Sequence, residues 1–273
     1  MANIGRRSTV AHGMALTLAQ KSGKKRRQLE AELISPPVSI SEIHKSPMIR
    51  VSLRTRAGNL VPKDIYSNVL KLASPVLKSE VESAQDGSQI VLNIGEQTFN
   101  QFLNWMYSGP YKVDFKPGRG GKHDILPQML QLWSFGKAKD ITNLYNAAIW
   151  LAACCGKKYD SLHISGRLDV LIAAYDNARG GQGLREFLVE VWAYEQRHHA
   201  ENGAFAASSN RNWPDGFTES LVIALGRTRD GTYECPYDGF SILEYKYNRD
   251  TNPAVTEEST LGGENEPILI EDD

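Results

Sequence analysis

The sequence has few cysteines, and none of the spacings that build a disulfide framework or a zinc site. Only Cys154, Cys155 and Cys235 occur in 273 residues, and no two of them form a CxxC pair. A disulfide-held scaffold and a cysteine-based zinc module are therefore excluded. Cys154 and Cys155 end an apolar stretch with helical spacing, so we expect both in the core.

Long hydrophobic runs and leader segments are also missing. No apolar run approaches the roughly 18 residues of a membrane span. The region around Arg6 and Arg7 is not followed by an apolar run with a small-residue cleavage site. We therefore expect a soluble intracellular protein without a membrane partner.

Motifs of catalysis and nucleotide binding do not occur. The glycine-rich stretches at 118–122 and 179–183 lack the spacing of a phosphate loop or a dinucleotide fold, and GxSxG, HExxH and DxDxDG are absent. His198 and His199 are adjacent on a predicted helix, where side chains point about 100° apart and chelate a metal poorly. We predict a protein that is not an enzyme, with no catalytic, cofactor-binding or metal-binding residues.

Charge is nearly balanced in total, with a net charge of −1, but it is unevenly placed. The stretch to about Lys45 is basic and contains the cluster Lys24, Lys25, Arg26 and Arg27, whereas eight acidic residues face one arginine from Asn248 onward. Both ends are poor in aromatic residues, which predicts disordered tails over 1–47 and 248–273. Residues 14–34 contain good helix formers, so a short helix that forms there on binding is the alternative for this segment. The chain is 41% hydrophobic, enough for a folded middle over roughly 48–245.

The early part of this middle has strand patterns and two short helices. Alternation and apolar runs predict strands at 48–54, 60–63 and 89–94. Pro62 limits the second of these to the edge or end of a sheet. From Ile65 the apolar spacing becomes helical, and Ser74-Pro75 is a good start for a second helix over about 75–82.

Helices dominate from Phe99 onward. The clearest helix ends at Gly109-Pro110 and carries an apolar stripe of Phe99, Phe102, Leu103, Met106 and Tyr107. Further amphipathic helices are predicted after Asp124, after Asp140, over 168–178, from Leu184 and after Trp213-Pro214. Strands followed by helices indicate an α+β fold rather than alternating βαβ units.

Several segments of the middle, taken in order, are similar to one family. IYSNVLKLASPVLKSEV (65–81) looks like its buried helix, Ser-Pro and second helix. QIVLNIGEQTFNQFLNWMYSG (89–109) looks like its strand and its helix ending in Tyr-x-Gly, and LPQMLQLWSFGKAKDITNLYNAAIWLA (126–152) looks like its helical pair. The segments resemble the BTB/POZ family, specifically the BTB-domain proteins of filamentous fungi. LREFLVEVWAYE (184–195) and WPDGFTESLVIAL (213–225) are similar to the helical extension of fungal members, so the resemblance covers 48–225.

The resemblance implies a BTB/POZ-like core over 48–155, a small sheet with surrounding helices, followed by a helical extension over 156–247. It implies a non-enzymatic protein–protein interaction module, and members commonly form homodimers. Many members also act as substrate adaptors for a cullin-RING ubiquitin ligase, and those that bind a cullin often carry an apolar-x-Glu motif after the Ser-Pro helix. Lys78-Ser79-Glu80 stands at that place with Lys for the apolar residue, so a cullin partner is an alternative. Ile65-Tyr66-Ser67 likewise replaces the common Val-His-Lys.

Two short charged segments indicate further partners. The Lys24–Arg27 cluster is typical of a nuclear localisation signal, which favours the nucleus over the cytoplasm. A nucleic-acid-associated regulator using this basic arm is the alternative of another class, although no zinc finger, bZIP repeat or recognition helix predicts direct DNA binding. Ile268, Leu269 and Ile270, followed by three acids, resemble a SUMO-interacting motif. Chance aliphatics, or a strand returning to the protein's own sheet, are the alternatives.

Overall fold

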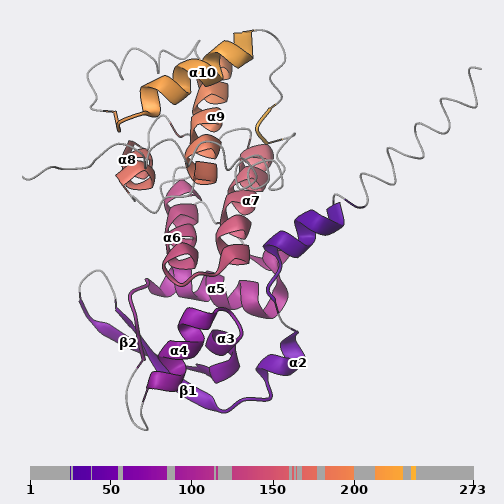
Figure 1. The fold of residues 1–273 in the computed structure, drawn as a ribbon, viewed down its shortest axis with the longest axis vertical. Helices are drawn as coiled ribbons and strands as arrows, with labels where there is room; N and C mark the ends of the chain where they lie inside the picture. The colour runs from indigo at the N-terminus through magenta and orange to yellow at the C-terminus, as the bar shows by residue number, and fades with distance from the viewer. Residues whose placement is uncertain are drawn as a thin grey trace, which may run out of the picture.

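A computed structural model shows a mixed α+β fold that is mostly helical, with one small sheet (Figure 1). In that view the sheet and the short helices lie at the bottom, α5 crosses the middle, α6 and α7 stand upright on α5, and α8 to α10 lie at the top. The residues that the structure describes are 25, 27–37, 39–54, 58–84, 90–113, 115, 125–159, 162, 164, 168–176, 182–199, 213–229 and 235–237.

The sheet has three strands in the order β2-β1-β3. The central strand β1 (Met48–Arg54) pairs antiparallel with β2 (Leu60–Tyr66) and parallel with β3 (Ile90–Leu92). Pro62 lies in β2, which is an edge strand, as predicted, because an edge tolerates a missing backbone donor. The predicted helix from Ile65 begins too early: Ile65 pairs with Ile49 in the sheet and is buried.

Short helices precede the first strand and separate β2 from β3. Helix α2 (Ile40–Ile43) precedes β1, and α3 (Ser67–Lys71) follows β2. Helix α4 (Pro75–Ser83) confirms the predicted Ser-Pro start, because the Ser74 hydroxyl oxygen accepts a 3.0 Å hydrogen bond from the backbone N–H of Leu77. That bond satisfies one of the free N–H groups at the start of the helix.

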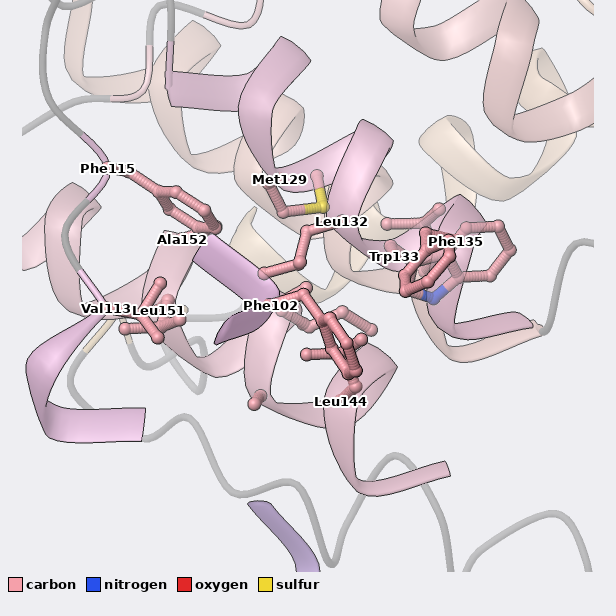
Figure 2. Close-up of a cluster of buried hydrophobic side chains, with 14 of the residues drawn as sticks. Phe102, Val113, Phe115, Met129, Leu132, Trp133, Phe135, Leu144, Leu151 and Ala152 are labelled. Atoms are coloured by element: carbon pink, nitrogen blue, oxygen red, sulfur yellow. The ribbon is translucent and has the colours of Figure 1, made fainter. Parts of the chain in front are cut away.

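Helix α5 (Glu96–Ser108) supplies the centre of the core. Phe99, Phe102 and Met106 are fully buried, as predicted, and Trp105 is buried with them. Leu103 and Tyr107, also predicted in this stripe, are only half-buried at the edge of the core. The helix ends at Gly109, whose φ of +74° suits glycine, and the 3-10 turn η1 (Pro110–Lys112) follows. Figure 2 shows Phe102 among side chains from 113–115, α6 and α7, namely Val113, Phe115, Met129, Leu132, Trp133, Phe135, Leu144, Leu151 and Ala152.

Helices α6 (Ile125–Ala138) and α7 (Thr142–Tyr159) form an antiparallel pair joined by a tight turn. Asp140 adopts a positive φ of 52°, and the N–H of Ile141 donates a 2.7 Å bond back to the carbonyl oxygen of Gly136. This is the hydrogen-bond pattern of a Schellman motif, which satisfies the carbonyl groups at the end of α6. A Cβ at Gly136 would lie 3.0 Å from the backbone nitrogen of Tyr145, so glycine allows the close approach.

The remaining helices are α8 (Leu168–Asp176), α9 (Gln182–His199) and α10 (Phe217–Arg229). Trp192 of α9 meets Trp213 edge-on at 5.1 Å between ring centroids, and Trp213 stacks on Phe217 at 5.0 Å. This aromatic group attaches α10 to α9. The domain boundary predicted between 155 and 156 falls inside the continuous helix α7.

The described residues before 48 belong to the fold, contrary to the prediction. Residues 27–34 are helical, and Ile34 and Ile43 are both buried in the core. A disordered tail over the whole of 1–47 is therefore wrong for the described residues in 27–47. The physical reason is packing against distant residues, which a scan of local composition does not register.

Candidate interaction surface

The helix at 27–34, called the arm helix below, is held by side chains from two other helices. The Trp105 indole N–H of α5 donates a 2.7 Å bond to the carbonyl oxygen of Ile34. From α7, the Asn143 amide donates to the carbonyl oxygens of Ser35 at 2.8 Å and Glu32 at 3.1 Å, and Asn146 donates to that of Leu33 at 3.5 Å. These are the carbonyl groups that a helix end leaves without partners, so the contacts fix the arm helix at its C-terminal end.

The basic cluster lies at the opposite end of the arm helix. Lys25 and Arg27 are exposed, while Lys24 and Arg26 lie outside the described residues. Figure 1 shows the arm helix in indigo, running from α5 and α7 toward the periphery. The anchored end therefore holds the helix on the core and leaves the two described cations accessible to a partner.

A second exposed surface lies where the β1–β2 hairpin meets α2. The His44 ring contacts Tyr66 edge-on at 4.8 Å and stacks on Tyr107 at 6.0 Å, measured between ring centroids. Met48 pairs in register with Tyr66 and is 58% exposed, and Ile40, one turn before His44, is 50% exposed. We call these five residues the hairpin patch. Burial and the neighbouring Tyr66 raise the pKa of Tyr107, so this phenol is neutral at physiological pH.

The middle of the hairpin face is polar. The Arg50 guanidinium forms a two-pronged hydrogen bond with the Asp64 carboxylate, at 2.9 and 3.2 Å. This pair raises the pKa of Arg50 and lowers that of Asp64 through hydrogen bonding and charge. Both side chains are well exposed, so the pair defines cross-strand register more than it adds stability.

The segment predicted as an alternative cullin contact is partly engaged within the protein. Lys78 and Ser79 are exposed on α4, but the Glu80 carboxylate is half-buried and accepts a hydrogen bond from the Lys139 ammonium. This ion pair ties α4 to the turn after α6. A role for Glu80 in binding a cullin stays a prediction, and binding there would have to compete with Lys139.

The cysteines divide between surface and core. Cys154 is exposed, so the expectation of a core position is wrong for this residue, whereas Cys155 is half-buried and packs against the core. Partial burial of its sulfur, opposed by the charge of Lys157, raises the pKa of Cys154 to about 11. The thiol is thus protonated near neutral pH, which disfavours nucleophilic attack.

A buried carboxylate near the C-terminal end of α9 was missed by the sequence analysis. Glu195 accepts hydrogen bonds from the backbone N–H groups of Leu162 at 2.6 Å and Ile164 at 2.8 Å, and from the Tyr237 hydroxyl at 3.2 Å. Desolvation and the carboxylate raise the pKa of Tyr237 far above its ordinary value. The network joins α9 to segments that lie before and after it, and we call it the Glu195 latch.

The latch also reaches α7 through a glycine. A Cβ at Gly156 would lie 2.3 Å from the Tyr237 ring, so the ring packs directly on the helix backbone. The only sequence signal for this contact is a glycine inside a helical run. Nothing local in the sequence distinguishes Glu195 from an exposed helix residue.

Several predicted positions lie outside the described residues. These are the SUMO-type residues Ile268, Leu269 and Ile270, and the glycine-rich stretches 118–122 and 179–181. His198 and His199 end α9, but their side chains are not described. Among the residues that the structure describes, no group of three His, Cys, Asp or Glu side chains is arranged to hold a metal ion.

Comparisons with protein-family models, curated protein sequences and solved structures gave no significant match to this chain. None of the helices within the described ranges is long and apolar enough to cross a membrane. A functional proposal therefore depends on the geometry of the arm helix, the hairpin patch and the Glu195 latch.

Proposed function

We propose that this protein is a non-enzymatic protein–protein interaction module of the BTB/POZ type. The order of its elements supports the proposal. A buried helix leads through Ser74-Pro75 to α4, the strand β3 leads to α5 and Gly109, and the pair α6–α7 follows. This is the order that the sequence resemblance implies for the family.

The hairpin patch is the observation that favours binding of a protein. Large apolar side chains exposed together around stacked rings mark interaction surfaces on soluble proteins. Here the His44 ring contacts those of Tyr66 and Tyr107, Met48 pairs in register with Tyr66, and Ile40 is exposed one turn before His44. Aromatic residues and methionine are also the types enriched at protein interfaces.

Quantitative affinity capture from the native cell tests the role of the hairpin patch. Ile40→Glu with Met48→Glu puts charge on the patch at two exposed positions, so the fold should be retained. Val222→Glu is the matched control, because Val222 is 63% exposed on α10 at the far end of the molecule. We expect the patch variant to lose a defined set of partners that the control keeps. Equal capture by both variants would refute the proposed surface.

Self-association is a second readout for the same surface. A second copy is one partner that the resemblance implies, and sedimentation at about 10–50 μM covers the range of weak dimers. A dimer that the patch variant abolishes and Val222→Glu retains would identify the partner as this chain. A dimer that survives in both variants would place self-association on another surface.

Nuclear targeting by the basic arm is a separate proposal. It is favoured by the exposure of Lys25 and Arg27 at the N-terminal end of the arm helix. A fluorescent fusion of the full chain, compared with a variant in which Lys24, Lys25, Arg26 and Arg27 are alanine, tests it. Import that persists without the four cations would contradict it.

A further inference from the structure

The outer edge of the sheet lies at β2. Strand β2 pairs with β1 on one side, and no strand among the residues that the structure describes pairs with its other side. The edge of a sheet exposes a row of backbone N–H and C=O groups, which is a template for an added strand. Extended segments of partner proteins bind to such edges through main-chain hydrogen bonds.

The register of the β1–β2 hairpin determines which residues of β2 direct their backbone groups outward. The backbone N–H of Ser67 donates a 2.9 Å bond to the carbonyl oxygen of Pro47, next to the pair of Met48 with Tyr66. In an antiparallel ladder, hydrogen-bonded pairs alternate with non-hydrogen-bonded pairs. Odd-numbered residues of β2 therefore bond to β1, and even-numbered residues such as Asp64 direct their N–H and C=O groups to the outer edge.

Pro62 divides this edge into two parts. Its position is even-numbered, so the N–H group that proline lacks would point outward, and the ladder to β1 loses no bond. A proline on an edge strand hinders the addition of a further strand, because one donor is missing there. Beyond the proline the edge keeps its donors, which are the N–H groups of Asp64 and Tyr66.

The side chains beside the open part of the edge favour one kind of added strand. Asp64 and Tyr66 are two positions apart in β2, so they lie on the same face of the sheet. Opposite charges on neighbouring strands are stabilising and like charges are destabilising, so Asp64 favours a basic residue opposite it. The two-pronged bond from Arg50 leaves acceptor sites on the Asp64 carboxylate for this residue. The half-buried Tyr66 ring favours an apolar residue.

We propose that an extended segment of another protein adds to β2 as an antiparallel strand along Pro62–Tyr66. This segment carries a basic residue opposite Asp64 and an apolar residue opposite Tyr66. Its main chain bonds to the C=O of Pro62, to both backbone groups of Asp64 and to the N–H of Tyr66. The site is continuous with the hairpin patch, because Met48 pairs in register with Tyr66. The inference rests on the proposed interaction function and specifies the form of the partner.

Titration of the ¹⁵N-labelled full chain with a defined peptide tests this site. The probe is a disulfide-closed β-hairpin peptide whose outer strand reads Thr-Leu-Thr-Lys-Thr-Val-Thr, because a preorganised strand loses less freedom on binding. Antiparallel to β2, it places Leu opposite Tyr66, Lys opposite Asp64 and Val opposite Pro62. We expect a dissociation constant on the order of 1 mM, with the largest amide shifts at Asp64 and Tyr66. No shift of these two amides at about 5 mM peptide would overturn the inference.

Two matched peptides test the main-chain bond and the charge separately. N-methylation of the Lys removes the donor that faces Asp64 but keeps the internal bonds of the peptide, so binding should weaken about tenfold. Lys changed to Glu places like charges opposite each other and should weaken binding about fivefold. Asp64→Asn should remove the difference between the Lys and Glu peptides. If N-methylation leaves the affinity unchanged, the peptide is not an added strand and the inference is wrong.

Pro62→Thr should strengthen the same contact. The substitution restores the outward N–H group and does not alter the ladder to β1, so the peptide should bind about fivefold more tightly. Val76→Thr is the matched control at an exposed apolar position on α4 and should leave the affinity unchanged. Equal affinity of Pro62→Thr and the control would count against a strand added at this edge.

The patch variant Ile40→Glu with Met48→Glu distinguishes this inference from the proposed function. Both positions lie outside β2, so the peptide should bind the variant as it binds the wild type. Loss of binding would place the peptide on the hairpin patch and overturn the inference. If the patch variant keeps every partner in affinity capture, the proposed surface is wrong, but the titration still decides the edge. A dimer of the peptide-free chain that Asp64→Lys abolishes would make a second copy the occupant and overturn the choice of another protein.

Discussion

The Trp105 indole of α5 donates a 2.7 Å hydrogen bond to the carbonyl oxygen of Ile34, 71 residues earlier in the chain. Both residues are fully buried. The bond satisfies a carbonyl group at the end of the arm helix, which would otherwise be desolvated without a partner. It makes a segment that looks like a polar tail part of the folded protein.

Trp105→Phe should therefore release the arm helix. We expect a loss of about 1–3 kcal/mol in the free energy of unfolding, because the change leaves the Ile34 carbonyl group buried and unpaired. Urea unfolding measures the loss, and hydrogen exchange over 30–34 locates it. Trp150→Phe is the matched control, since Trp150 is half-buried and meets Tyr111 edge-on at 5.3 Å. Equal losses in both variants would contradict the role given to Trp105.

Phe102→Ala tests the predicted stripe of α5. Phe102 is fully buried and lies among side chains of α6 and α7 (Figure 2), so its removal should cost about 3–5 kcal/mol. Leu103→Ala, at the next position, removes a half-buried side chain and should cost less than half of that. Comparable losses in chemical denaturation would mean that Phe102 is no more central to the core than the half-buried Leu103.

The elements that could be predicted from the sequence are those marked by neighbouring residues, such as a helix cap, a proline or an apolar spacing. Ser74-Pro75 caps and starts α4, Pro62 lies on an edge strand, and Phe99, Phe102 and Met106 of the predicted α5 stripe are buried. Ile65 was predicted to be helical because its spacing to Val69 fits a helix, whereas it pairs with Ile49 across the hairpin. Pairing across a sheet leaves no periodic trace in a single sequence.

The contacts around the candidate surfaces were less predictable for the same reason. Ile34 and Ile43 lie in a stretch whose composition predicted a disordered tail, and their burial depends on residues such as Trp105 and Asn143. The Glu195 latch joins residues 42 positions apart in sequence, and its two backbone donors have no sequence signal at all. Exposed cations such as Lys25 were identified, because charge clusters can be read locally.

Tyr237 should give the protein a distinctive alkaline instability. Desolvation and Glu195 raise the pKa of Tyr237 in the folded state above the value of about 10 in the unfolded chain. The folded state then keeps a proton that the unfolded chain loses. This contribution to stability is complete below about pH 10 and falls by roughly 1.4 kcal/mol per pH unit above it.

Tyr237→Phe removes this titration. Urea unfolding between about pH 9 and pH 11 should show a shallower fall for the variant than for the wild type. Tyr107 and Tyr175 also have a raised pKa, so some alkaline dependence remains. At neutral pH the variant should lose about 1 kcal/mol, for the hydrogen bond to Glu195. Parallel curves for variant and wild type would show that the phenol is not held by the latch.

Gly156→Ala should open the Glu195 latch from the side of α7. The new Cβ would lie 2.3 Å from Cε1 of Tyr237, inside the distance that any carbon tolerates, so the ring must move away from the carboxylate. We expect a loss of about 1–3 kcal/mol in urea unfolding, with faster proteolysis near 235–237. Gly226→Ala on α10 is the control. Beyond the backbone of its own helix and its chain neighbours, nothing lies within 4 Å of its added Cβ, so alanine there should stabilise by about 0.5–1 kcal/mol.

A double mutant separates the steric effect of Gly156→Ala from the effect of alanine on helix propensity. In a chain that already carries Tyr237→Ala, the ring is gone and Gly156→Ala meets no obstacle, so its cost should disappear or reverse sign. The coupling free energy between the two changes should therefore be about 1–3 kcal/mol. If Gly156→Ala lowers the free energy of unfolding equally with and without the Tyr237 ring, the position of the ring does not depend on this glycine. Tyr237 must then be held in place by Glu195 alone.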